Sequence, residues 1–93
     1  MRLVPGLQLR TIGTEYLAIP SGPAAARLNG LMMLNETGAF LLRALQTDSD
    51  RESLLRQLQA EYDAGEELLQ KDLDDFLSQM RELRLLEEDG HEA

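Results

Sequence analysis

The stretch GLMMLNETGAF, residues 30–40, joins an apolar run directly to the start of a helix. The run consists of Leu31, Met32, Met33 and Leu34. A half-buried strand alternates apolar with polar residues, because neighbouring side chains point to opposite faces. Asn35 then supplies a good N-cap for a helix. The stretch therefore predicts a strand that is apolar on both faces. It leaves open which pair of side chains faces the core and what covers the other pair.

Two further strands are predicted before this run. Residues 7–13 (LQLRTIG) alternate apolar and polar side chains, and residues 15–20 (EYLAIP) have the composition of a second strand. The cluster PSGP at residues 20–23 ends that strand, and residues 24–29 are expected to cross over to the third. The order of these segments predicts a three-stranded meander.

The pattern becomes helical after Asn35. Leucines at helical spacing predict a first helix up to Leu45, and Ser49 with Glu52 fits the S-x-x-E capping box of a second. A third and longest helix begins with Glu66, with Gly65 at its N-cap, and carries arginines in its last turns. Its expected buried stripe is Leu69, Leu73, Phe76, Leu77, Met80 and Leu83. Leu85 and Leu86 are expected to return to the core.

These elements predict an α+β fold, with a three-stranded antiparallel sheet followed by three helices. The last two helices, joined by a short turn, indicate a winged helix-turn-helix-like arrangement. We expect one domain over residues 1–88 and a flexible acidic tail over residues 89–93.

Composition excludes several classes of protein. The chain of 93 residues has no Cys, which excludes disulfides and thiolate chemistry, and no apolar stretch fits a signal peptide or a membrane span. We therefore expect a cytoplasmic protein. Residues 1–47 carry four Arg and two acids, for +2, while residues 48–93 carry five bases and 15 acids, for −10, which together give the net charge of −8. An acidic chain repels phosphate backbones, so nucleic acid is a poor partner.

The residues offer little for catalysis. The one histidine, His91, falls in the expected tail. Asp72 and Asp75 lie three residues apart on one helix face and could offer oxygens to a hard cation, but two carboxylates with no further ligand are typical of a solvated helix face. We expect no metal site, no cofactor and no enzymatic activity.

The apolar run suggests a binding site. The third strand of a meander lies at an edge, where its outer backbone groups have no partner, and residues 31–34 have none of the Lys, Pro or bulge that protects such edges. Such an edge can take up an extended peptide as an added strand. The alternative is that helices simply cover both faces of the strand.

The order of these signals resembles the PqqD family, named for protein D of pyrroloquinoline quinone biosynthesis, and the wider class of RiPP recognition elements. The matching elements are Leu34-Asn35, Thr37-Gly38-Ala39, Tyr62-Asp63, Asp72-Leu73, Phe76-Leu77 and Leu85-Leu86. The resemblance covers about residues 28–88. It implies a winged-helix-like domain that holds the leader segment of a ribosomally made precursor peptide and presents it to a modifying enzyme. That enzyme would be a radical-SAM protein, a cyclase or a leader peptidase.

The resemblance also implies a site. The leader would pair with residues 31–34, and Asp72, Asp75, Phe76 and Gln79 would line the helical side. The acidic second half of the chain predicts basic or neutral leader residues beside the third helix, with charge reversal at Asp75 as the test. Two alternatives stay open: a winged-helix transcriptional regulator, which the charge disfavours, and an assembly subunit whose apolar edge pairs with itself in a homodimer.

Overall fold

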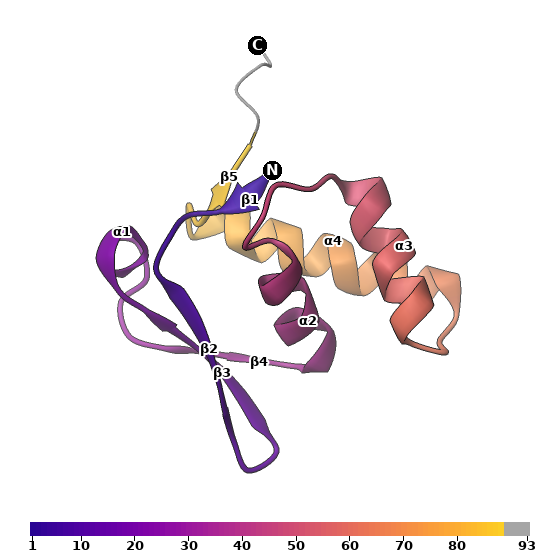
Figure 1. Ribbon diagram of the computed structural model, residues 1–93, viewed down its shortest axis with the longest axis horizontal. Helices are drawn as coiled ribbons and strands as arrows, with labels where there is room; N and C mark the ends of the chain where they lie inside the picture. Colours follow the sequence, from indigo (N-terminus) through magenta and orange to yellow (C-terminus); the bar gives the residue numbers. More distant parts are fainter. Residues whose placement is uncertain (89–93) are drawn as a thin grey trace.

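A three-stranded antiparallel sheet organises the first half of the chain in the computed structural model, which describes residues 1–88 (Figure 1). Its strands are β2 (Leu7–Ile12), β3 (Glu15–Pro20) and β4 (Met32–Leu34), in the order β2-β3-β4. β4 therefore lies at an edge, as the sequence predicts. The third strand begins at Met32, so Leu31 precedes it.

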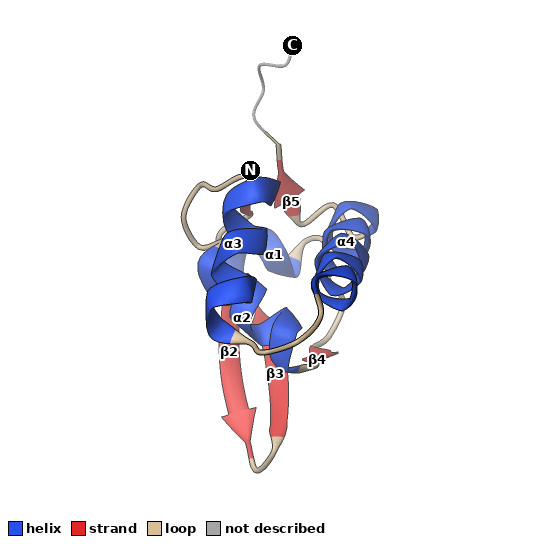
Figure 2. Ribbon diagram, turned by 90° about the vertical axis from the view of Figure 1, so that its right-hand side faces the viewer, coloured by secondary structure: helices blue, strands red, loops and turns tan. Residues whose placement is uncertain are grey.

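Three helices follow the sheet, which confirms the predicted α+β fold. They are α2 (Glu36–Ala44), α3 (Arg51–Glu61) and α4 (Glu66–Glu82). α2 contacts all three strands and also packs against α3 and α4. Figure 2 shows the helices in front of the sheet, so they cover one of its faces.

Two parts of the fold were not predicted. Residues 22–25, expected to belong to a turn and a crossover, form the short helix α1 (Gly22–Ala25). A second antiparallel sheet joins β1 (Arg2–Leu3) to β5 (Leu86–Glu87), so the two ends of the described chain lie side by side (Figure 1). The expected tail at residues 89–93, with His91, lies outside the described residues.

The helix caps confirm one prediction and correct another. Asn35 caps α2, because its side chain accepts a hydrogen bond from the Gly38 amide at 2.8 Å. The predicted capping box of Ser49 and Glu52 is wrong: Asp50 caps α3 and accepts from the Ser53 amide at 2.8 Å. Aspartate is as good a cap as serine, and with the cap at residue 50 Glu52 stands one position too early for a capping box.

Leucines dominate the core, which both sheets and the helices share. The predicted stripe of α4 is buried except at Leu83, which is half-buried, and Leu85 returns to the core as expected. The largest fully buried side chains are Leu41, Leu42, Leu45, Leu54, Leu58, Leu69, Leu73, Leu77, Met80 and Leu85. In the part of the chain that the structure describes, no helix has the length and apolarity needed to cross a membrane.

Gly6 holds the start of β2 against α1. Its carbonyl accepts hydrogen bonds from the Ser21 amide at 2.9 Å and from the Ser21 hydroxyl at 3.2 Å. Its φ of +108° is unfavourable for other residues, and a Cβ at this position would overlap the Ser21 carbonyl oxygen.

We expect Gly6→Ala to destabilise the fold by more than about 1 kcal/mol, because it adds a steric clash to an unfavourable φ. Gly30→Ala is the matched control, since Gly30 has a similar φ of +97° and the Cβ that alanine would add there meets open space. Urea unfolding should show a clearly larger loss for Gly6→Ala. Equal losses would contradict the assigned contact with Ser21.

An ion pair joins α3 to α4. The Arg51 guanidinium donates to both carboxylate oxygens of Asp74, at 2.8 and 2.9 Å. These hydrogen bonds lower the pKa of Asp74 and raise the pKa of Arg51. Because the folded pKa of Asp74 is depressed, its contribution to stability is present above the unfolded pKa of about 4 and is lost as the pH falls through the folded value.

Asp74→Asn should therefore lower the melting temperature slightly at pH 7, and the difference from wild type should shrink as the pH is lowered below about 4. Thermal unfolding from neutral to acid pH measures both effects. Glu82→Gln serves as the control, because Glu82 forms no ion pair with another residue in the described chain. A difference for Asp74→Asn that stays constant into strong acid would contradict the ion pair.

Candidate functional site

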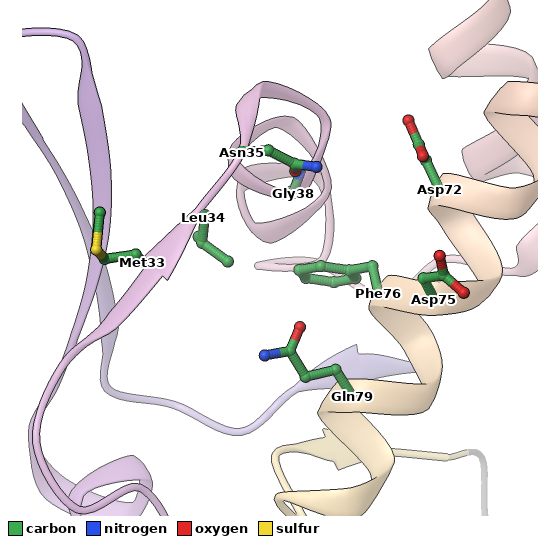
Figure 3. A pocket seen from close by; sticks show the side chains of 8 residues that line it. All are labelled: Met33, Leu34, Asn35, Gly38, Asp72, Asp75, Phe76 and Gln79. Carbon is green, nitrogen blue, oxygen red and sulfur yellow. The ribbon is translucent and has the colours of Figure 1, made fainter.

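A cleft of about 220 Å³ lies between β4 and α4 (Figure 3). One wall comes from the end of β4 and the first turn of α2, and the other comes from α4. The lining residues are Met33, Leu34, Asn35, Gly38, Asp72, Asp75, Phe76 and Gln79. Phe76 and Gln79 extend from α4 toward β4, whereas Met33 extends away from α4.

The structure brings six of the eight predicted site residues to this cleft. The two that do not line it are Met32 and Leu31. Met32 is buried on the core face, where its sulfur lies 3.4 Å from the Gln79 amide nitrogen. Leu31 stands before the strand and is 56% exposed. The alternation that the sequence left open is thus settled, with Met32 toward the core and Met33 outward.

Phe76 serves both the core and the cleft. Its side chain is only 5% exposed and belongs to the core cluster, yet it lines the cleft opposite Leu34. The α4 wall of the cleft is therefore apolar at this point and continuous with the core. Because Phe76 is already almost fully buried, a ligand at this point would gain apolar burial mainly from the half-buried Leu34.

Asn35 and Gly38 were not predicted as site residues. Both belong to the cap of α2, and a Cβ on Gly38 would lie 3.0 Å from Asn35 Oδ1 and 3.4 Å from a Leu34 methyl carbon. The Thr37 hydroxyl lies 3.2 Å from Asn35 Oδ1 and 3.4 Å from Asp72 Oδ2, so it can donate to either. The sequence signal for these residues was the capping motif, which indicated a helix start and gave no hint of a cleft.

The outer edge of β4 faces this cleft. β4 pairs with β3 through Met32, Met33 and Leu34, and no strand among residues 1–88 pairs with its other side. Edge amides and carbonyls of this kind can form hydrogen bonds with an added strand. The cleft therefore combines a backbone edge with a side-chain wall.

The acidic residues of the cleft differ in their partners. Asp75 accepts a hydrogen bond from the Lys71 ammonium at 2.7 Å, which raises the pKa of Lys71. Asp72 has no ion pair with another residue in the described part of the chain and receives only the long contact from Thr37. Lys71 thus offsets the charge of Asp75 directly and attracts Asp72 only through a weaker Coulombic interaction, so Asp72 presents a carboxylate with no hydrogen-bonded cation at the cleft. Over residues 1–88, no group of three or more metal-binding side chains is close enough together to hold a metal ion.

The solved structure "TbiB1 in Complex with the TbiA(beta) Leader Peptide" has the same fold as this chain. The TM-score is 0.70, and the match covers 97% of this chain and 99% of that chain at 20% sequence identity. Among curated protein sequences, none matches. The family model described as coenzyme PQQ synthesis protein D (PqqD) matches residues 15–86, which include both walls of the cleft. This chain therefore belongs to the PqqD family.

Proposed function

We propose that this chain binds the leader segment of a ribosomally synthesised precursor peptide by strand addition to β4 and presents it to a modifying enzyme. The observation that carries the proposal is the unpaired edge of β4 beside the cleft formed with α4. Family membership supports it, as does the similarity in fold to TbiB1, whose structure contains a leader peptide.

The backbone edge of β4 would supply binding affinity, and the side chains of the cleft would determine which leader sequences bind. A leader strand next to Met32–Leu34 would form main-chain hydrogen bonds whatever its sequence. Its inward side chains would meet Leu34 and Phe76, which favour an apolar residue, and the Gln79 amide, which can donate and accept hydrogen bonds. Leu31, predicted to pair with the leader, lies just before β4 and would contact the leader only beyond the strand.

The negative charge of Asp72 would select among leaders. An acidic leader residue beside Asp72 would be repelled, whereas a basic residue would gain an ion pair and a neutral one would carry no penalty. We therefore propose that the leader has a basic or neutral residue where it crosses the first half of α4. Asp75 is a poorer test site than the sequence suggested, because reversing its charge also releases Lys71.

We further propose that the chain performs no chemical change itself. Its role would be to hold the leader while a partner enzyme, such as a radical-SAM protein, a cyclase or a leader peptidase, acts on the rest of the precursor in the cytoplasm. No cofactor or metal is needed for this role. A homodimer through the β4 edge would compete with the leader for the same backbone groups.

Strand addition predicts that the effect of N-methylating the leader peptide alternates from one residue to the next. In an added strand, alternate amides point toward β4, so N-methylation at every second leader residue should weaken binding by about tenfold, and N-methylation in between should have little effect. The probe is a synthetic copy of the leader half of the short precursor peptide encoded beside this chain. Fluorescence anisotropy measures the affinities. Equal sensitivity at consecutive positions would exclude a strand.

The charge at the cleft predicts a second effect. Asp72→Lys should weaken binding of that leader peptide by at least about fivefold if its facing residue is basic, and the loss should shrink as salt is added. Glu82→Lys is the matched control: it makes the same charge change on α4 outside the cleft and should stay within about twofold. Equal losses of leader affinity in the two variants would show that only the net charge of the chain matters, and would contradict a specific contact between the leader and Asp72.

A further inference from the structure

The three-stranded sheet has a second face that points away from the core. Ala18 and Met32 pair across β3 and β4, and both are buried. Their neighbours Leu17 and Met33, which pair with each other, point to the opposite face because successive side chains in a strand alternate. The same alternation places two isoleucines, one on β2 and one on β3, on this face. We call the side chains of Ile12, Leu17, Ile19 and Met33 the outer patch.

The outer patch is apolar where a solvated sheet face is usually polar. Met33 is 62% exposed and Ile12 is 61% exposed. Leu17 and Ile19 are half-buried, yet neither is among the half-buried side chains that pack against the core. Scattered apolar side chains are normal on a surface, but an apolar patch that crosses three neighbouring strands is typical of an interaction site.

The helices α2 to α4 leave this patch uncovered. α2 packs on all three strands from the core side. In Figure 1, α2, α3 and α4 lie on the same side of the β2–β3 hairpin, and Figure 2 shows them in front of the sheet. The exposed fractions of Ile12 and Met33 agree with this arrangement.

The polar surroundings of the patch indicate the charge of its partner. Two exposed charged residues stand on this face: Arg10, which pairs with Leu17 across β2 and β3, and Glu15, which pairs with Ile12. Over residues 1–88 neither of them forms an ion pair. The patch also belongs to the basic half of the chain, because residues 1–47 carry +2 and residues 48–93 carry −10. A partner would complement this face with an apolar surface that places a carboxylate opposite Arg10 and no acidic group opposite Glu15.

We propose that the outer patch docks the enzyme that modifies the precursor peptide. The inference rests on the proposed function, because its partner is the enzyme to which the leader is presented. Met33 connects the two surfaces, since it lines the leader cleft and also belongs to the outer patch. An enzyme on the patch would therefore meet the leader where it leaves β4. A second copy of this chain fits less well, because two copies that each carry a net charge of −8 repel each other.

The sequence makes the patch easy to observe. Ile12 and Ile19 are the only isoleucines in the chain, so isoleucine methyl signals report on the outer patch alone. We would label isoleucine and methionine methyl groups and add, separately, the synthetic leader peptide and the unlabelled modifying enzyme encoded beside this chain. The enzyme should shift or broaden both isoleucine signals and that of Met33. The leader should perturb Met32 and Met33, while the core residue Met80 should change in neither titration.

A variant pair tests the energetics of docking. Ile12→Thr combined with Leu17→Thr places β-branched residues on the strands and should weaken binding of the enzyme by at least about tenfold, with leader affinity within about twofold. Leu68→Thr is the control, because Leu68 is 55% exposed on α4, outside the patch, and its substitution should leave binding of the enzyme unchanged. Calorimetry measures both affinities.

Each negative outcome has its own meaning. If the enzyme binds and the isoleucine signals stay unchanged, the inference is wrong and the proposed function is unaffected. If the isoleucine signals move with protein concentration alone and the mass is that of a dimer, the patch belongs to a second copy and the inference is also wrong. If the leader leaves Met32 and Met33 unperturbed, the proposed function fails.

Discussion

The backbone of β4 has hydrogen-bonding groups on both sides, and β3 pairs with one side only, so the other side is open to an added strand. The site depends on this constraint. The Asn35 cap turns the chain into α2 directly after Leu34, which ends the strand, and no later strand among residues 1–88 pairs with this edge. α4 is held across from β4 by its buried leucines and by the ion pair to Arg51, which leaves a cleft between them.

The two faces of β4 have different functions in the proposed complex. Met32 faces the core and anchors the strand, while Met33 faces outward and borders both the cleft and the outer patch. An unbroken apolar run is therefore compatible with one buried face and one face left for partners. Most acidic residues of the chain lie in its helical second half, whereas the outer patch lies in the first half. The leader peptide and the modifying enzyme would therefore contact surfaces of different charge.

Local patterns predicted most of the fold. The turn cluster after Pro20, the Asn35 cap and the leucine spacing indicated the three strands and three helices, because each depends on residues close in sequence. β1 and β5 were missed because two-residue strands have no period and their pairing joins distant residues. Six of the eight predicted site residues line the cleft, but the resemblance to a known family supplied those of α4. Alternation alone could not place Met32, since both faces of the strand are apolar.

The most direct test of strand addition is an amide NMR titration of this chain with the leader half of the neighbouring precursor peptide. Strand addition predicts that shifts are confined to residues 30–38 and 69–83, which contain the two walls of the cleft. Shifts elsewhere with these two segments silent, or no shifts together with the mass of a dimer, would contradict the claim that the open edge of β4 receives the peptide.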